Sequence, residues 1–329
     1  MDLETITLPG IVIESVEYVM DNAVDVTIDD ASLRVVADKI SERLSKGIDT
    51  VEDAFGSTGV LEQDVNLIFF ETACNFYFWN EDDATKWKVN VEGRLIGGWY
   101  GLTACFNKAL KNNIPVYDAA WMARLTPNIA RNLFAGNDMQ IPLLEQRVNN
   151  IVEMANFLLQ EHDGQAINFI AANHCSAPHI AEEIVRALPS FRDGAFYKGR
   201  WVWILKRAQI LPSDVSQLAA KYPEFAIADA DKLTAFADYR IPQVLRHFGA
   251  ISYSDNLAGT VNSSTILPVG SSQEIEIRAA TVVACERLKQ YLPGTTTSAD
   301  IDLGLWLISQ DIHDDPTLLP HHRTPGYFY

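Results

Sequence analysis

The segment PLLEQRVNNIVEMANFLLQEH, residues 142–162, shows the pattern that dominates this chain. Its apolar residues recur every three or four positions, so that one face of a helix is hydrophobic and the opposite face is polar. Pro142 suits the first turn of such a helix, because the N–H that proline lacks would have no partner there. The segment therefore predicts the longest helix of a mainly α-helical protein. Its apolar stripe consists of Leu144, Val148, Ile151, Ala155, Leu158 and Leu159.

The same periodicity extends over most of the chain, and one short segment alternates like a strand. Residues 87–91 alternate between apolar and polar side chains, Glu92 and Gly93 suit a turn, and residues 95–96 return. Pro242 should start or kink its helix. We therefore expect a mainly α fold with a minor β-hairpin. Helical patterns cover residues 32–47, 101–113, 126–134, 176–188, 201–211, 232–248, 276–292 (amphipathic) and 297–308.

Composition and charge limit the possible partners. The chain has 329 residues, of which 48% are hydrophobic and 21% are charged, as in globular proteins. Such a length allows a single domain, residues 1–329, or two helical lobes, about residues 1–165 and 166–329, with the active site between them. With 26 basic and 43 acidic residues the net charge is −17, which repels phosphate backbones. We therefore expect no nucleic-acid polymer as a partner, although a local basic pocket can bind a small phosphorylated ligand.

The cysteines and the apolar runs indicate the compartment. Cys74, Cys105, Cys175 and Cys285 are far apart and form no C-x-x-C pair, which argues against a disulfide framework and fits a reducing environment. The first residues lack the basic-then-apolar order of a signal peptide, and no stretch approaches about 18 uninterrupted apolar residues. We expect a cytoplasmic protein with no membrane partner.

Familiar motifs for cofactors and metals are missing. The chain contains no P-loop, no dinucleotide fingerprint, no H-E-x-x-H and no G-x-S-x-G. His174 and His179, with Cys175, are a weak candidate for a metal site, because positions five apart fall on different faces of a helix.

Two segments place charges among residues of buried type. In WVWILKRAQ, residues 201–209, Lys206 and Arg207 follow five apolar residues. A buried cation needs an anionic partner, but a helix that turns outward to solvent explains the pattern equally well. In LTAFADYRIPQ, residues 233–243, an aromatic residue and Asp238 precede a proline bend, which suits a site that stacks a ring and positions an acid. The alternative is a surface pair of Asp238 with Arg240 that caps the next helix.

Two further segments near the end of the chain are ambiguous. In DIDLGLW, residues 300–306, Asp302 is expected in the first turn of a helix, where the helix dipole favours an acid in any protein. The segment PHHRTPGYFY, residues 320–329, is aromatic and basic. It fits a docked tail, or a source of phosphate-binding groups such as His322 and Arg323.

Taken together, these segments resemble the queuosine salvage proteins, the queuosine 5′-phosphate N-glycosylase/hydrolase family, in family order along nearly the whole chain. The resemblance implies an all-α, DNA-glycosylase-like fold and hydrolysis of queuosine 5′-monophosphate to queuine and ribose 5-phosphate. Some relatives carry a histidine where this chain has Asp53 nearby, and Pro325 departs from the basic residue of related tails. The matching stretches are NFYFW (75–79), IPLLEQR (141–147), WVWILKRAQIL (201–211), FADYRIPQVLRHFGAISYSDNL (236–257), EIEIRA (274–279), IDLGLW (301–306) and the HHR…FY terminus.

Cleavage of an N-glycosidic bond builds positive charge on the anomeric carbon, which a carboxylate stabilises or attacks. Queuine is a 7-deazaguanine without the N7 that other purine-releasing enzymes protonate, so the departing base needs preorganised hydrogen bonds at its other polar edges. The resemblance thus implies two acids: Asp302 at the anomeric carbon as nucleophile or stabiliser, and Asp238 at the base, with the reverse assignment open.

The resemblance also implies the surrounding groups. Phe236 stacks on the base and Tyr239 lines the pocket, and Asp53 and Trp306 belong to the same site. Because water is the co-substrate, no metal or other cofactor is expected. The 5′-phosphate clamp is Lys206 with His322 and Arg323. The groups that hold the carboxylates in place are Arg207 or Arg240.

Two other functions are alternatives to this one. The first is a glycosylase that acts on DNA or intact tRNA, against which the charge of −17 argues. The second is a non-catalytic module that binds a nucleoside without cleaving it. We expect a monomer that acts on a small nucleotide.

Overall fold

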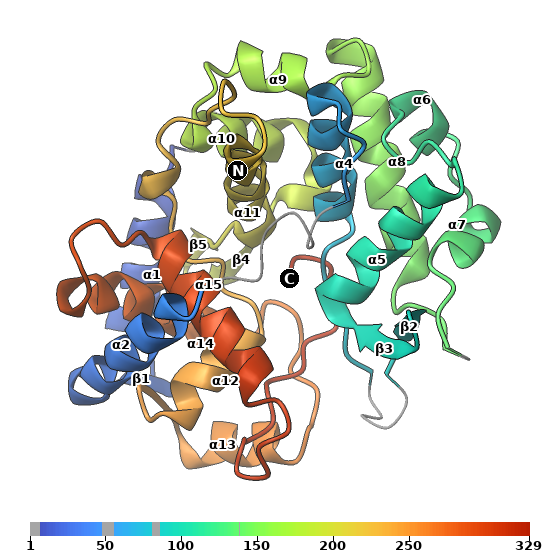
Figure 1. Ribbon diagram of the computed structural model, residues 1–329. Coiled ribbons are helices and arrows are strands. Elements are labelled where there is room, and N and C mark those ends of the chain that lie inside the picture. Colours follow the sequence, from blue (N-terminus) through green and yellow to red (C-terminus); the bar gives the residue numbers. More distant parts are fainter. Residues whose placement is uncertain (1–6, 48–55, 81–85, 138) are drawn as a thin grey trace. The chain divides into compact units, whose positions relative to one another are not determined.

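The computed structural model describes residues 7–47, 56–80, 86–137 and 139–329, and helices dominate it (Figure 1). The described residues form fourteen α-helices and three two-stranded antiparallel sheets, which confirms the predicted mainly α class. The likeness to DNA glycosylases stays a prediction. None of the helices formed by the described residues is long and apolar enough to cross a membrane.

The chain divides into two units, each with its own internal packing. Unit 1 comprises residues 1–48, 192–209 and 229–329, and unit 2 comprises residues 49–191 and 210–228. Each unit is therefore assembled from stretches that are separated in the sequence. These ranges differ from the lobes expected at about residues 1–165 and 166–329, since unit 1 joins residues 1–48 to the C-terminal part and unit 2 continues to residue 191.

Unit 2 contains the helix predicted first, which forms but begins at Leu144, so the expectation that Pro142 lies in its first turn is wrong. Helix α8 buries Val148, Ile151 and Leu158, whereas Leu159 of the predicted stripe is 40% exposed. The predicted hairpin is confirmed as β2 and β3, with Glu92 and Gly93 in the turn at φ values of 51° and 86°. The elements of unit 2 are α4 (Leu61–Ala73), β2 (Lys88–Val91), β3 (Arg94–Gly97), α5 (Gly98–Lys111), α6 (Ala119–Met122), α7 (Pro127–Leu133), α8 (Leu144–Glu161), α9 (Ala166–Ala172) and α10 (Ala177–Ala187).

Unit 1 is built around helix α14, which packs against α1, α2, α12 and α15. The expectation of an amphipathic helix here is wrong. Residues 274–282 of helix α14 are all buried, including the polar residues Glu274, Glu276 and Arg278, because neighbouring elements cover each face of this part of the helix. The elements of unit 1 are α1 (Gly10–Asp21), β1 (Val26–Ile28), α2 (Asp30–Ser45), β4 (Gly194–Tyr197), β5 (Arg200–Trp203), α12 (Arg240–His247), β6 (Ile251–Tyr253), α13 (Asp255–Asn262), α14 (Ser272–Leu288) and α15 (Ser298–Asp311).

Two sheets of unit 1 escaped the prediction. Residues 201–203 form strand β5 rather than the start of a helix, and β1 pairs with β6 across more than two hundred residues of sequence. Helix α11 (Lys206–Ser216) begins only after Leu205, whose φ of 55° is left-handed, and it runs from unit 1 into unit 2. Apolar residues alone cannot distinguish a short buried strand from a helical turn.

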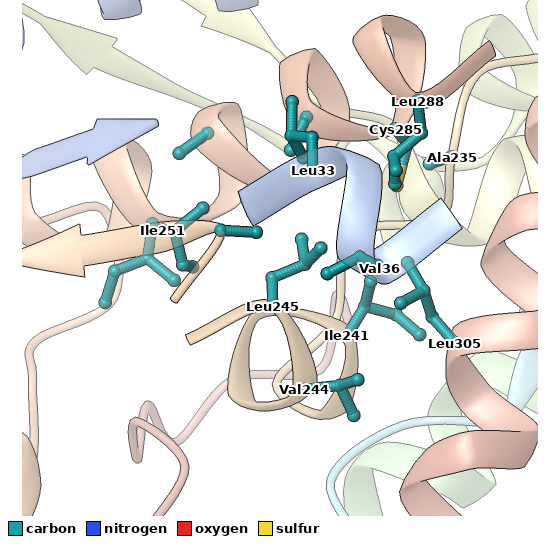
Figure 2. Close-up of a cluster of buried hydrophobic side chains, with 14 of the residues drawn as sticks. Leu33, Val36, Ala235, Ile241, Val244, Leu245, Ile251, Cys285, Leu288 and Leu305 are labelled. Carbon is teal, nitrogen blue, oxygen red and sulfur yellow. The ribbon is translucent and has the colours of Figure 1, made fainter. Parts of the chain in front are cut away.

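The hydrophobic core of unit 1 lies where α2, α12, α14 and α15 meet (Figure 2). Helix α12 begins two residues before Pro242, as predicted for a proline in the first turn. Side chains from the four helices interdigitate, which fixes the helices relative to one another. Members of this cluster include Leu33, Val36, Ile40, Ile241, Val244, Leu245, Ile277, Cys285, Leu288, Ile301 and Leu305.

Candidate active site

A short segment before helix α12, residues 233–238, carries two of the predicted site residues. Its backbone is held by side chains from distant parts of the sequence. The N–H of Thr234 donates to Oε1 of Gln209 at 2.9 Å, and the N–H of Phe236 donates to Oδ1 of Asp302 at 2.8 Å. Three of the segments singled out in the sequence therefore meet here, all within unit 1.

Asp302 is 8% exposed and lies in the second turn of α15. The first-turn acid is Asp300, which forms a capping box with Thr297. The expectation that Asp302 is a first-turn acid favoured by the helix dipole is therefore wrong. Its carboxylate is instead oriented by the amide of Phe236, a residue expected to contact the base.

Asp238 is partly buried and caps helix α12. Its Oδ1 accepts hydrogen bonds from the N–H groups of Arg240 and Ile241, at 2.7 and 2.9 Å. Asp238 thus binds the first amides of the next helix, as the alternative expected, but the surface pair of Asp238 with Arg240 is not found among the described residues. The guanidinium of Arg240 donates instead to Gln243 at 3.0 Å. Among the described residues, Oδ2 of Asp238 has no hydrogen-bond partner, which leaves that oxygen available to a ligand.

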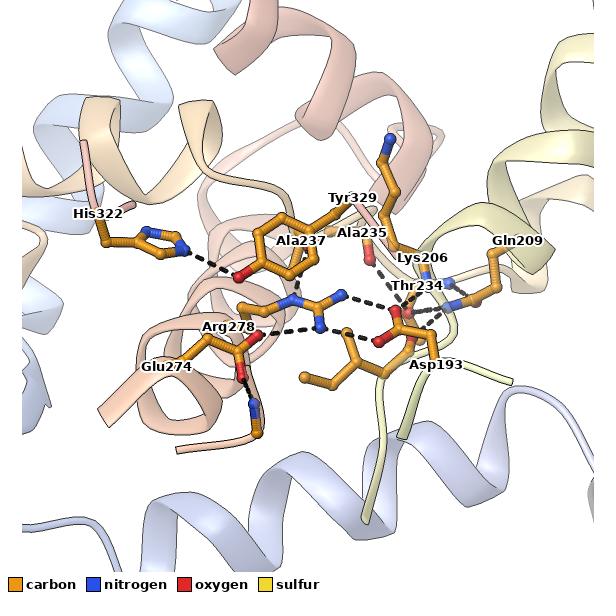
Figure 3. Close-up of polar contacts among 12 residues, drawn as sticks. Asp193, Lys206, Gln209, Thr234, Ala235, Ala237, Glu274, Arg278, His322 and Tyr329 are labelled. Carbon is orange, nitrogen blue, oxygen red and sulfur yellow. Dashed lines mark hydrogen bonds and ion pairs between the residues drawn. The ribbon is translucent and has the colours of Figure 1, made fainter. Parts of the chain in front are cut away.

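Lys206 and Arg207 are 6% and 1% exposed, so the alternative of a helix that turns outward to solvent is wrong. Lys206 opens helix α11, and its backbone N–H donates to Oδ2 of Asp193 at 2.9 Å. The ammonium group of Lys206 points away from that carboxylate (Figure 3). This lysine thus presents its charge on the side away from Asp193.

A buried ion network lies beside residues 233–238. Arg278 donates from Nη1 and Nη2 to the two carboxylate oxygens of Asp193, at 2.8 and 2.6 Å. The Nε group of Arg278 donates to the carbonyl of Ala237 at 3.1 Å, and Glu274 lies 3.3 Å from Nη1 (Figure 3). One guanidinium therefore binds Asp193, Glu274 and the segment that carries Phe236 and Asp238.

Burial and neighbouring charges together set the pKa values of Arg278 and Glu274 in this network. Burial alone lowers the pKa of Arg278, but the negative charge of Asp193 and then that of Glu274 outweigh it, and the pKa rises above its ordinary value. Burial also raises the pKa of Glu274, and Arg278 opposes this shift. The arginine is therefore charged at every physiological pH.

The end of the chain is docked in unit 1. His322 and Arg323 are 1% and 5% exposed, and the carbonyl of Arg323 accepts a hydrogen bond from the N–H of Leu267 at 2.8 Å. Burial, and then the nearby charges of His321 and Arg278, hold the pKa of His322 well below its usual range. At neutral pH His322 can therefore donate a hydrogen bond to a phosphate but adds no positive charge.

The remaining predicted residues have separate neighbours. The ring of Tyr239 lies against His321, with 4.7 Å between the ring centroids. Trp306 is partly buried and packs against the hydrophobic core, one helical turn beyond Asp302. Asp53 lies outside the described residues.

Comparison with known proteins agrees with the resemblance seen in the sequence. The family model described as queuosine salvage protein matches residues 57–329. This chain belongs to the queuosine salvage protein family. A protein of Bos taurus named queuosine 5′-phosphate N-glycosylase/hydrolase is 30% identical over 96% of this chain and 98% of its own length. Proteins with the same name from Sphaerobacter thermophilus and Schizosaccharomyces pombe are 36% and 28% identical, over 80% and 91% of this chain and 81% and 91% of their own lengths.

Two residues of this queuosine salvage family member were missed as candidates. Asp193 and Arg278 hold the site segments, although neither belongs to the predicted site. A signal existed for Arg278, because it lies in the stretch EIEIRA, which matches the family and mixes charged with apolar residues. No signal marked Asp193, which is brought to Arg278 only by the tertiary fold.

A small cavity and a pair of histidines are the other candidate regions for ligand or metal binding. A cavity of about 30 Å³ lies beside Asp193, Glu274 and Arg278, which is room for a water molecule and not for a nucleotide. The rings of His174 and His179 are 6.0 Å apart. The described part of the chain contains no group of three or more histidine, cysteine or acidic residues that could hold a metal ion.

Proposed function

We propose that this protein hydrolyses the N-glycosidic bond of queuosine 5′-monophosphate and releases queuine and ribose 5-phosphate. The observation that carries the proposal is the similarity, over nearly the whole chain, to proteins named for this activity. The hydrogen bonds that join Phe236 to Asp302 and Ala237 to Arg278 support it, because they unite family stretches that are distant in the sequence.

In this proposal Asp302 acts at the sugar. As the glycosidic bond breaks, positive charge develops on the anomeric carbon, and a carboxylate fixed beside it lowers the energy of that state or attacks it. The hydrogen bond from the Phe236 amide restricts rotation of the Asp302 carboxylate, so little reorganisation is needed during the reaction. Water supplies the hydroxyl group of the sugar product and a proton for the departing base.

Asp238 and Phe236 act at the base. Phe236 is 5% exposed and supplies an aromatic face, while Oδ2 of Asp238, which has no partner among the described residues, can accept hydrogen bonds from the polar edge of queuine. Because queuine lacks N7, such contacts are the available means to stabilise it as a leaving group. Tyr239 and Trp306 line the same pocket in this proposal.

The 5′-phosphate is assigned to Lys206 and Arg323, with His322 as a neutral hydrogen-bond donor. Both cationic side chains are buried in unit 1, at 6% and 5% exposure, and such charges can attract a phosphate inside a chain of net charge −17. Arg207 and Asp53 stay predicted members of the site. The cytoplasmic location and the monomeric state also stay predictions.

The test is to replace each carboxylate by its neutral isostere. Asp302→Asn keeps an oxygen that can accept the Phe236 N–H, and Asp238→Asn keeps a residue that caps helices well, so both variants should fold. We expect turnover to fall by about 100-fold or more in each, because a positioned carboxylate typically contributes that much. Mass spectrometry of queuine and ribose 5-phosphate released from queuosine 5′-monophosphate measures it.

Asp311→Asn is the matched control, since Asp311 lies in the same helix and is exposed in a surface ion pair with Arg43. Its turnover should equal that of the wild type. Near wild-type turnover in both Asp302→Asn and Asp238→Asn would contradict the assignment of the two acids. Absence of queuine release by the wild type would contradict the function itself.

A further inference from the structure

We propose that Arg278 is a positioning residue, which holds residues 236–238 at the base end of the active site against the fixed carboxylate of Asp193. This inference rests on the proposed function, because it assigns Arg278 to the recognition of the departing base. It adds a residue that acts through its neighbours and does not itself touch the substrate.

Arg278 joins two parts of the structure through its guanidinium group. Its side chain is 3% exposed, and all three guanidinium nitrogens donate hydrogen bonds. Two of them bind the carboxylate of Asp193 side by side, which fixes the plane of the guanidinium. The third, Nε, donates to the carbonyl of Ala237, the residue between Phe236 and Asp238. The position of the Ala237 carbonyl is thereby fixed relative to the carboxylate of Asp193.

The other contacts of Arg278 prevent it from moving away. The guanidinium lies over the ring of Tyr329, at 4.0 Å from the ring centroid, and Glu274 lies one turn earlier on the same helix at 3.3 Å. Asp193 is itself held by the backbone N–H of Lys206 at 2.9 Å. The guanidinium therefore has a carboxylate at its edge and an aromatic ring over its face.

Net stability does not explain this arrangement well. A buried ion pair commonly stabilises a fold no better than apolar residues of the same volume, because both charges lose their hydration. What Arg278 provides, and an apolar side chain cannot, is a directed hydrogen bond to the carbonyl of Ala237. Displacement of a reacting group by about 1 Å can cost about 100-fold in rate, so such a bond has value for catalysis.

Arg278→Lys separates the contribution of the bond to Ala237 from that of the ion pair with Asp193. A lysine keeps the charge and can reach Asp193, but its single nitrogen cannot also hold Ala237 in the same geometry. We expect kcat to fall by about 10- to 100-fold. Affinity for queuine should fall by about 10-fold, whereas affinity for ribose 5-phosphate should stay within about twofold, because the bond from Lys206 to Asp193 is kept. Steady-state kinetics and calorimetry with each product measure these changes.

Hydrogen–deuterium exchange tests the same inference without any ligand. In Arg278→Lys the amides of residues 234–241 should exchange faster than in the wild type, while those of residues 206–211 should be unchanged. Arg287→Lys is the control, because Arg287 lies on the same helix and pairs with Asp30 at the surface. It should alter neither the exchange nor the kinetics.

Three results would overturn the inference. The first is wild-type kinetics and exchange in Arg278→Lys. The second is an equal loss of affinity for both products together with a lower melting temperature, which indicates a general structural role. The third is faster exchange at residues 206–211 than at residues 234–241. A wild type that releases no queuine refutes the proposed function, and the exchange experiment then still decides whether Arg278 holds residues 236–238.

Discussion

Buried charged residues in this protein differ in whether they have hydrogen-bond partners. Arg278 is buried with partners for all its nitrogens, whereas Glu71 in helix α4 is 1% exposed and, among the described residues, neither of its carboxyl oxygens has a hydrogen-bond partner. Burial, and then the negative charges of Asp214 and Asp64, raise the pKa of Glu71 well above its ordinary value of 4.5. The carboxyl group is thus neutral in the folded protein over a range in which it ionises after unfolding.

This shift predicts a pH-dependent stability that Glu71→Gln removes. Because the folded pKa is raised, the contribution of Glu71 is fully present below the unfolded pKa and is lost as the pH rises through the folded pKa. Over that window the free energy of unfolding should fall by up to about 1.4 kcal/mol per pH unit. Glutamine stays neutral, so urea unfolding of Glu71→Gln should lack this component of the slope.

The exposed Glu62 of the same helix provides the control, and Glu62→Gln should keep the wild-type slope. The measurement is urea unfolding from about pH 5 to about pH 8. If Glu71→Gln and the wild type lose stability in parallel as the pH rises, Glu71 is charged in the folded state and this reading of its burial is wrong.

Elements of unit 1 approach one another closely at one glycine. Gly304 lies in α15 between Asp302 and Trp306, and a Cβ atom placed there would lie 2.8 Å from Cγ2 of Ile40 in α2. Ile40 is fully buried and β-branched, so its methyl group cannot easily move away. The absence of a side chain at Gly304 thus lets α15, which carries Asp302, lie against α2.

Gly304→Ala should therefore destabilise the protein. Overpacking costs about 1–3 kcal/mol, and the higher helix propensity of alanine returns at most about 1 kcal/mol, so we expect a net loss of about 1–2 kcal/mol. Gly259→Ala in α13 is the matched control, because nothing lies within 4 Å of its Cβ position. That change should leave the protein equally or slightly more stable. Chemical unfolding of both variants checks the pair, and a Gly304→Ala protein as stable as Gly259→Ala would contradict the close packing.

The whole molecule is strongly acidic, and this bears on its choice of substrate. A net charge of −17 repels a nucleic-acid polymer much more than a mononucleotide, since a polymer presents many phosphates at once. We expect at least about 100-fold faster queuine release from queuosine 5′-monophosphate than from the same residue in intact tRNA. Mass spectrometry of queuine from intact and nuclease-digested tRNA compares the two.

Salt identifies the cause of that preference. If repulsion restricts access, added salt should raise any residual release from intact tRNA, because it screens charges beyond about 10 Å. Equal release from polymer and digest at low salt would show that charge does not select the substrate.

The sequence by itself determined the helical class, the hairpin β2–β3, the acidic surface and the family. These depend on local periodicity, on overall composition, or on the order of motifs along the chain, all of which can be read from the sequence. It also indicated Asp302, Asp238 and Lys206 as candidates, since charges within apolar stretches are visible without a structure. The burial of Lys206 excluded the alternative of a helix that turns outward to solvent, and the hydrogen bonds of Asp238 showed which backbone groups it binds.

Only the tertiary structure decided how these residues are joined. Asp193 and Arg278 are 85 residues apart, and Phe236 and Asp302 are 66 apart, so no local pattern could pair them. The burial of residues 274–282 of α14 on every face likewise follows from what packs around them. Hydrogen bonds and burial depend on distance in space. Folding brings stretches that are distant in the sequence into one unit, and the residues next to each group in the sequence do not reveal which distant group it will contact.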